Sequence, residues 1–361
     1  MAFQKIENEE GLRKLKESVR TGSFAPLYFF HGEERYLQEY YLQLMKKKLV
    51  TGPMEDFNFR RFPMGAATAD GVREAIESVP MMADATLVQI DDVNPLAQSA
   101  SERKLWEQLL EDIPDYCYVV FYFDTVPFSK RPKNEKETDG EKNAEKDHLA
   151  ETVKKVGIEV EFFKQSESEL AEWISRHFKA AGKLISSELC RYLIFLTDGT
   201  MTALSAEIEK ISAYSGADTI VQSDIDAVVV PTLSAVMFDI TDALAAKQYD
   251  TALRKLSDVL AGQEEPLAVL GAVGSQFRRI LLAKQITAGG GSVGELTALL
   301  GKGKEGYARR LISLAGRFSE SCLKTALELC FETDCRLKRS FDDAPILMQE
   351  LILHLAQEGR Q

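Results

Sequence analysis

Over residues 1–164, apolar residues recur along the chain with two different periods. Short, nearly continuous apolar runs have the composition of buried strands, and between them apolar residues recur every three or four positions, as on one face of a helix. The clearest helix is expected at 33–49, and a shorter one at 72–79 has Val72 and Val79 on its apolar face. This alternation is typical of βαβ units, so we expect an α/β domain built on a mainly parallel sheet. The predicted strands are 27–30, 57–62, 86–90, 116–123 and 158–163.

After this first domain, the apolar period is helical throughout. Ser166 and Glu169 have the spacing of a capping box, which predicts the start of the first helix. Pro231 separates a small helical domain at 165–231 from a longer all-α bundle at 232–361. No internal repeat has a fixed period, so a solenoid is not indicated.

A charged segment at 129–147 interrupts the first domain. It is rich in Lys, Glu, Asp, Asn and Gly with almost no apolar side chains, and its charges nearly balance. Such a segment buries too little surface to offset the entropy lost on ordering it. We therefore expect a mobile surface insert.

The composition is that of a globular protein with several cores, since 45% of the 361 residues are hydrophobic. The formal net charge is −12, so the overall field does not attract nucleic acid. Residues 1–10 lack the apolar stretch of a signal peptide, and no run of about 18 apolar residues occurs that would span a membrane. We expect a soluble, cytoplasmic protein with no membrane contact.

The five cysteines are scattered and form no ligand pattern. Cys330 and Cys335 are too far apart for a CxxC pair, and no histidine cluster lies near them. We expect no metal site, and a reducing compartment fits these thiols.

The strand at 27–30 and the helix that follows it stand where a phosphate-binding loop would lie. Such a loop needs two glycines with four residues between them, then Lys and Ser or Thr, so that backbone N–H groups and the lysine hold the phosphates. Here the turn has only Gly32, followed by Glu33 and Glu34. Two acids at a helix N-terminus suit the helix dipole, but they repel an anionic ligand. We therefore expect a degenerate nucleotide site with no cofactor and no catalytic residue.

Asp91 and Asp92 follow an apolar strand, as the magnesium-binding acids of NTPases do. One alternative is accordingly a degenerate NTPase that uses Arg35 with these two acids. The other interpretation is an ordinary polar strand end, which the absence of a phosphate loop favours.

The segment Pro80-Met81-Met82 lies between a predicted helix and a predicted strand. Proline disfavours helical geometry at the residue before it, so both methionines are expected in a loop or at a helix tip. If exposed, they form an adaptable apolar plug for a pocket on another protein. In the alternative, both pack beneath the sheet as part of its core.

Four segments together resemble the delta-subunit family of the bacterial DNA polymerase III clamp loader. Their order and spacing agree with that family along nearly the whole chain. They are 26–34 with Leu37, 80–82 followed by 86–92, 199–204 with Glu207, Glu209 and Lys210, and 333–338.

The resemblance implies a three-domain AAA+-like architecture without an ATPase of its own, within the DNA polymerase III holoenzyme. The first domain would bind the ring-shaped sliding clamp (beta) through Met81 and Met82, with Pro80 beside them. The last domain would join a collar with the ATP-hydrolysing gamma/tau subunits and delta-prime. The subunit would then hold one clamp interface open while the ring passes over primed DNA. In this family the apolar pair is more often Leu-Phe or Phe-Phe, and an acid is common where Met201 stands.

A further alternative is a helical DNA-binding regulator. It would use two arginine pairs in the helical part of the chain as phosphate contacts. These residues are Arg278, Arg279, Arg309 and Arg310.

Overall fold

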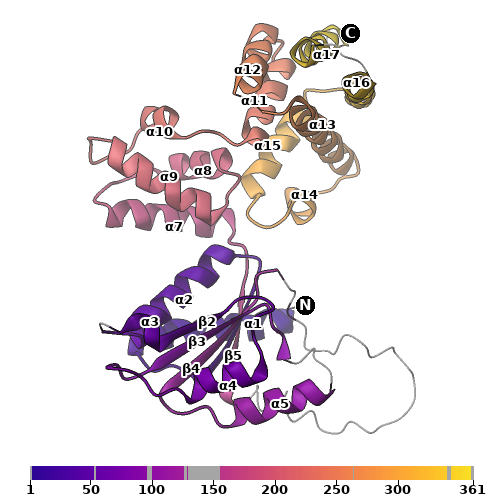
Figure 1. Ribbon diagram of the computed structural model, residues 1–361. Coiled ribbons are helices and arrows are strands. Elements are labelled where there is room, and N and C mark those ends of the chain that lie inside the picture. The colour runs from indigo at the N-terminus through magenta and orange to yellow at the C-terminus, as the bar shows by residue number, and fades with distance from the viewer. Residues whose placement is uncertain are drawn as a thin grey trace. The chain divides into compact units, whose positions relative to one another are not determined.

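The computed structural model describes residues 2–52, 54–95, 100–125, 128, 155–262, 264–339 and 343–358. The chain forms two compact units, Met1–Lys164 and Gln165–Gln361 (Figure 1). The charged segment predicted as an insert at 129–147 lies outside the described residues.

The first unit is built on a parallel sheet with the strand order β2-β3-β4-β1-β5. Each described strand pair is parallel, and all six residues of β3 are buried because helices cover both faces of the sheet. This confirms the predicted α/β architecture. The strands are β1 Leu27–Gly32, β2 Phe59–Phe62, β3 Thr86–Asp91, β4 Cys117–Tyr122 and β5 Gly157–Phe162.

Side chains that alternate along β1 enter two separate cores. Phe29 packs with residues of α4 and α5 on one face of the sheet, while Phe30 packs with residues of α1 and α2 on the other. Because successive side chains of a strand point to opposite faces, the sheet has a core on each side and forms the middle of three layers. The helices of this unit are α1 Ala2–Thr21, α2 Arg35–Leu49, α3 Glu55–Asn58, α4 Ala69–Glu77 and α5 Ala100–Glu111.

Three local predictions for this unit were wrong or incomplete. Val79 does not lie on a helix face, because α4 ends at Glu77 and the side chain of Val79 is 74% exposed. Pro80 accounts for this, since it excludes its predecessor from helical geometry. The strand expected from residue 57 begins at Phe59, and α3 occupies the positions before it. Helix α1 was not predicted.

Helix α1 lies directly on the backbone of β5. A Cβ atom at Gly11 would overlap the carbonyl oxygen of Glu159 and lie 3.3 Å from the Cα atom of Val160. Glycine therefore permits an approach that a side chain would prevent. Leu15, one turn further along α1, is fully buried in the core beneath this helix.

The elements of the second unit are all helices in its described parts, apart from an isolated bridge between Leu184 and Thr219. The capping box at Ser166 is confirmed, since the N–H of Glu169 donates to Ser166 Oγ at 3.3 Å and the N–H of Ser166 donates to Glu169 Oε2 at 2.6 Å. The division of this unit at Pro231 stays a prediction. The helices are α7 Glu167–Ala180, α8 Ser187–Leu196, α9 Met201–Tyr214, α10 Gln222–Val228, α11 Leu233–Ala245, α12 Tyr249–Ala261, α13 Pro266–Ala288, α14 Val293–Leu300, α15 Glu305–Ala315, α16 Glu320–Arg339 and α17 Ala344–Glu358.

Among the described residues, no single helix is both long and apolar enough to span a membrane. The pair α10 and α11 reaches the required length and composition only when taken together, and the two helices are bent by 117°.

Three of the five cysteines are buried in these cores. Burial raises the pKa of the thiols of Cys117, Cys190 and Cys330 to about 11 in each case. Cys322 and Cys335 are partly exposed.

We expect Gly11→Ala to destabilise the first unit by about 1–3 kcal/mol, because the added methyl group must push α1 away from β5. Gly271→Ala is the matched control, since Gly271 also lies inside a helix but has open space around it. There the exchange should stabilise by about 0.5–1 kcal/mol. Trp106 lies in the first unit and Trp173 in the second, and they are the only two tryptophans. The urea unfolding of each unit can therefore be followed by the fluorescence of its own tryptophan. Equal effects at the two glycines would contradict the close contact.

We expect a thiol reagent at pH 8 to label Cys322 and Cys335 rapidly and the three buried cysteines only on unfolding. Only the thiolate reacts, and a pKa of about 11 for Cys117, Cys190 and Cys330 leaves little thiolate at that pH. Mass spectrometry of digests taken over time measures each rate. Rapid labelling of Cys117 in the folded chain would contradict the burial described here.

Candidate functional site

The two regions singled out from the sequence lie at opposite edges of the sheet. Because the strands are parallel, their carboxyl ends meet at one edge and their amino ends at the other. The β1–α2 turn (Gly32, Glu33 and Glu34) and the end of β3 at Asp91 lie at the carboxyl edge. Residues 78–85, which link α4 to β3 and are called the methionine loop below, lie at the amino edge. The length of the strands therefore separates the methionine pair from the degenerate nucleotide site.

The β1–α2 turn is short and closed against β5. Only Glu33 and Glu34 separate the end of β1 from the start of α2. The N–H of Glu34 donates to the carbonyl oxygen of Phe162 at 3.0 Å, and a Cβ atom at Gly32 would overlap that oxygen. Burial raises the pKa of the Glu34 carboxyl. A turn of two residues that is bonded to β5 leaves no backbone loop to surround a phosphate group.

Asp91 at the end of β3 is engaged by neighbouring side chains. Its carboxylate accepts hydrogen bonds from Arg61 Nε at 2.7 Å and from Gln89 Nε2 at 2.6 Å. The bond to Asp91 raises the pKa of the Arg61 guanidinium. Within the described part of the chain, no group of three or more His, Cys, Asp or Glu residues is placed to hold a metal ion.

Asp92 binds the segment that follows β4. Its Oδ1 accepts hydrogen bonds from the N–H groups of Asp124 at 2.8 Å and Thr125 at 3.0 Å, and its Oδ2 accepts one from the Thr125 hydroxyl at 2.7 Å. Arg35, the third residue of the NTPase alternative, forms an ion pair with Asp124 at 2.6 Å. These contacts favour the interpretation of both acids as polar strand ends that fix the adjoining segments.

The methionine loop exposes apolar side chains. The exposed fractions are 74% for Val79, 47% for Met81 and 72% for Met82. Neither methionine belongs to the core of the sheet, which excludes the alternative in which both pack beneath it. Pro80 is half-buried between the exposed positions.

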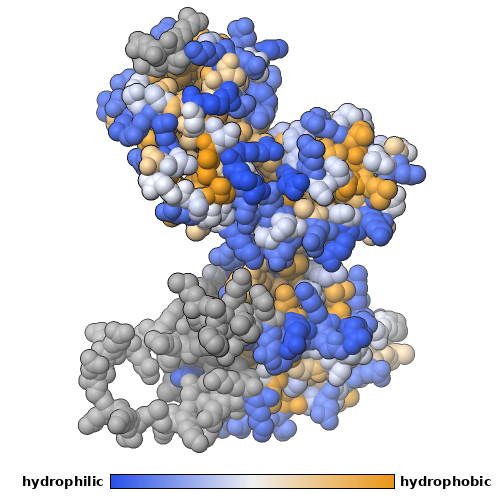
Figure 2. Space-filling view, turned by 180° about the vertical axis from the view of Figure 1, so that it is seen from behind, coloured by the Kyte–Doolittle hydropathy of each residue, from blue (hydrophilic) through white to orange (hydrophobic). Residues whose placement is uncertain are grey.

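Exposure alone does not identify a site in this protein. Figure 2 shows that apolar residues also gather on the surface over helices α7–α10, where Leu184 is 61% and Val221 is 50% exposed. At Leu184 the backbone is fixed by main-chain bonds to Asp218 and Ile220, whereas in the methionine loop it is fixed by a buried side chain.

Asn58 fixes the methionine loop from the last turn of α3. Its Nδ2 donates to the carbonyl oxygen of Met81 at 2.8 Å, and its Oδ1 accepts from the N–H of Met81 at 2.7 Å. Asn58 is only 1% exposed. Sequence reasoning missed this residue, since its partner lies 23 positions away and no local pattern connects the two.

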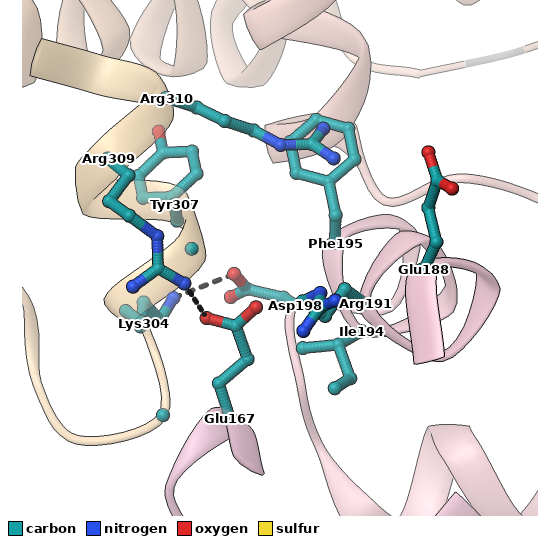
Figure 3. Close-up of a pocket in the computed structure, with 12 residues that line it drawn as sticks. Glu167, Glu188, Arg191, Ile194, Phe195, Asp198, Lys304, Tyr307, Arg309 and Arg310 are labelled. Atoms are coloured by element: carbon teal, nitrogen blue, oxygen red, sulfur yellow. Dashed lines mark hydrogen bonds and ion pairs between the residues drawn. The ribbon is translucent and has the colours of Figure 1, made fainter. Parts of the chain in front are cut away.

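The second unit contains a surface pocket of about 430 Å³ between α8, α15 and the start of α7 (Figure 3). Charged side chains that line this pocket form ion pairs with one another. Arg309 forms an ion pair with Glu167 at 2.9 Å, and Lys304 forms one with Asp198 at 2.7 Å. The guanidinium of Arg310 lies over the ring of Phe195, 4.2 Å from its centroid. Two of the arginines proposed as phosphate contacts are thus engaged inside the unit.

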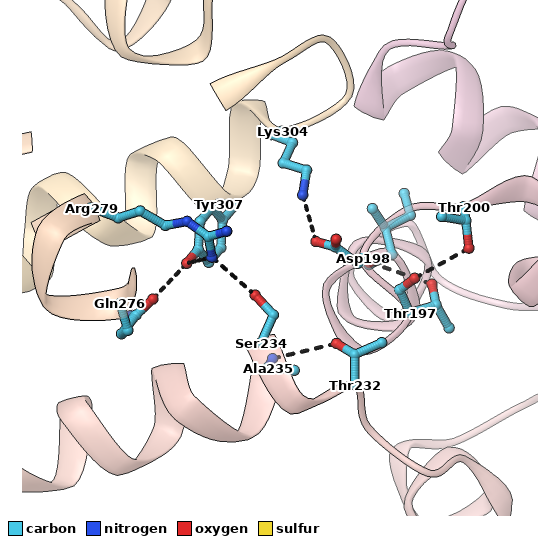
Figure 4. Close-up of polar contacts among 11 residues, drawn as sticks. Thr197, Asp198, Thr200, Thr232, Ser234, Ala235, Gln276, Arg279, Lys304 and Tyr307 are labelled. Carbon is cyan, nitrogen blue, oxygen red and sulfur yellow. Dashed lines mark hydrogen bonds and ion pairs between the residues drawn. The ribbon is translucent and has the colours of Figure 1, made fainter. Parts of the chain in front are cut away.

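The other two arginines also make internal contacts. Arg279 donates to the hydroxyls of Ser234 and Tyr307, at 3.3 Å in both cases (Figure 4). Arg278 donates to Ser275 Oγ at 3.2 Å. Arg279, Arg309 and Arg310 therefore link helices, whereas the bond of Arg278 stays within α13. For the first three residues, a packing role is better supported than a role in binding DNA.

Comparison with known proteins gives the same family at both ends of the chain. The model of the DNA polymerase III delta subunit matches residues 28–148, and the model of the C-terminal domain of the DNA polymerase III delta subunit matches 234–355.

One curated relative and one solved structure cover nearly the whole chain. DNA polymerase III subunit delta of Bacillus subtilis (strain 168) is 22% identical over 351 residues, which are 96% of this chain and 97% of that protein. The solved Bacillus subtilis DNA clamp loader delta protein (YqeN) superimposes with a TM-score of 0.64 at 21% identity, over 95% of this chain and 99% of that one. The structural match shows that this chain shares the fold of that protein along nearly its whole length, with an α/β unit followed by a helical unit. Together, the matches to both delta-subunit models and to a relative of the same length show that this chain belongs to the DNA polymerase III delta-subunit family.

Proposed function

We propose that this protein binds the sliding clamp through Met81 and Met82, with Pro80 beside them, and opens it for loading onto primed DNA. The observation that carries the proposal is the methionine loop, in which both side chains are exposed while the backbone is fixed by a buried residue. An apolar pair presented in this way suits a hydrophobic pocket on another protein.

The proposed action is mechanical rather than chemical. Full burial of a methionine side chain contributes about 1.5–3 kcal/mol. A ligand shifts an equilibrium only by the difference between its affinities for the two states. The loop therefore opens the ring if it binds the open clamp interface more tightly than the closed one.

We infer that the chain neither binds nor hydrolyses ATP and has no catalytic activity of its own. The inference is supported by the closed β1–α2 turn and by the internal contacts of Arg35, Asp91 and Asp92. In the assembled DNA polymerase III complex, the gamma/tau subunits would supply ATP hydrolysis. The complex would work in the cytoplasm, where bacterial DNA is replicated.

The last helices are the proposed contact with gamma/tau and delta-prime in the collar. Helices α16 and α17 carry three exposed apolar side chains, with exposed fractions of 68% for Phe331, 53% for Ile346 and 47% for Leu353. Aromatic and aliphatic side chains of this kind are common at the centres of subunit interfaces. Contact with primed DNA would then depend on the assembled complex.

We expect Met81→Ala/Met82→Ala to weaken binding to the purified sliding clamp by about 100-fold, since about 3 kcal/mol of apolar burial is lost. Surface plasmon resonance with immobilised clamp measures the affinity. Met64→Ala is the matched control, because Met64 is 64% exposed but follows β2 at the opposite edge of the sheet. Clamp binding of normal strength in the double variant would contradict the proposed site.

We expect the isolated chain to show no heat of ATP–Mg²⁺ binding in calorimetry and to bind the clamp equally well with and without ATP. Glu33→Ala/Glu34→Ala should not gain ATP binding, because the length of the turn excludes a phosphate as much as its charge does. Saturable ATP binding by the unmodified chain would favour the NTPase alternative. Binding only by the double variant would show that charge alone closes the site.

A further inference from the structure

The methionine loop has a conformation that its own side chains do not stabilise. Met82 has a φ of 53°, in the left-handed region that residues other than glycine rarely adopt. Such a conformation costs about 1–2 kcal/mol. Met81 and Met82 are largely exposed, so little apolar burial within the chain offsets this cost.

The side chain of Asn58 supplies the missing stabilisation. It satisfies both backbone groups of Met81, at 2.7 and 2.8 Å, and also donates to the carbonyl oxygen of Met54 at 3.1 Å. Each hydrogen bond contributes about 0.5–1.5 kcal/mol, and a buried group left without its partner costs about 1–3 kcal/mol. The pair of bonds to Met81 is therefore large enough to offset the backbone geometry at Met82.

Asn58 is itself mounted on a rigid support. It is the last residue of α3, and Phe59 immediately after it begins β2, paired in register with Leu87 of β3. Lys46 of α2 forms an ion pair with Glu55 of α3 at 2.9 Å. Its Nζ atom also lies over the ring of Phe59, 4.2 Å from the ring centroid. Asn58, which fixes the methionine loop, is thus held between a helix that is paired to α2 and the edge strand β2.

The same short helix presents an apolar side chain to solvent. Phe57, next to Asn58, is 56% exposed. In this turn, the amide of Asn58 points inward to the backbone of the methionine loop, and the ring of the adjacent Phe57 is exposed to solvent.

We infer that Asn58 is a positioning residue for clamp binding, which sets the backbone of Met81 so that Met81 and Met82 are presented in their binding geometry before the clamp arrives. The inference rests on the proposed function. Its physical basis is that a loop already ordered in the free protein loses less conformational entropy on binding.

The test compares two buried amides in the same unit. Asn58→Ala removes the bonds to Met81, whereas Gln38→Ala removes a fully buried amide that donates to the Gly32 carbonyl oxygen at 3.1 Å, at the opposite edge of the sheet. We expect Asn58→Ala to lower clamp affinity about 10- to 100-fold, equivalent to about 1.4–2.8 kcal/mol. Gln38→Ala should leave the affinity unchanged, even though it also destabilises the unit.

Methyl NMR of ¹³C-labelled methionine gives a second reading that does not depend on the clamp. In Asn58→Ala, the methyl signals of Met81 and Met82 should move to the positions of a disordered chain. Those of Met45 and Met348, which are fully buried, should stay in place. If Asn58→Ala fails to fold, Asn58→Asp is measured instead, because it keeps the size and the bond from the Met81 N–H but cannot donate as a carboxylate.

The outcomes separate this inference from the proposed function. Normal clamp binding by Asn58→Ala together with loss of binding by Met81→Ala/Met82→Ala would overturn the role of Asn58 and leave the clamp site in place. Unchanged methyl signals of Met81 and Met82 would also overturn that role. An equal loss in Gln38→Ala would show that general destabilisation is responsible. Normal binding by the methionine double variant would overturn both proposals.

Discussion

The burial of the parallel sheet on both faces is the constraint on which the first unit depends. Helices occupy both surfaces of the sheet, so groups that meet a partner must lie where strands begin or end. At the carboxyl edge, the β1–α2 turn rests on β5, and Asp91 and Asp92 are bound to neighbouring residues. The amino edge has the opposite character, because the methionine loop there directs its apolar side chains to solvent. The fold thus separates the closed β1–α2 turn from the surface that the protein is proposed to use.

The sequence predicted the order and type of the elements well because buried strands and amphipathic helices have distinct periods. It could not decide whether Met81 and Met82 were buried, since spacing does not show where α4 ends. It missed α1, whose apolar residues Leu12, Leu15 and Val19 are spaced among charged residues and whose close approach to β5 requires the absence of a side chain at Gly11. It also missed Asn58, because an amide that bonds to a distant backbone has no periodic signature.

Several charged side chains of the helical unit pair with one another. Arg309 and Lys304 link α15 and the segment before it to α7 and the end of α8, and Arg279 joins α13 to α11 and α15. The net charge of −12 also disfavours attraction of nucleic acid by the overall field of the chain. Three of the four arginines that suggested DNA binding thus take part in helix packing, while the apolar residues on α16 and α17 remain as candidate subunit contacts.

The two outer strands of the sheet, β2 and β5, are both protected against pairing with another chain. An exposed strand edge is a template on which another chain can add a strand. Among the described strands, β2 forms one edge and has only 4 residues, of which Arg60 and Arg61 are exposed. The other edge, β5, is covered closely by α1 at Gly11. With both edges protected, the protein can keep an apolar loop in water until it meets a partner without offering its sheet for uncontrolled self-association.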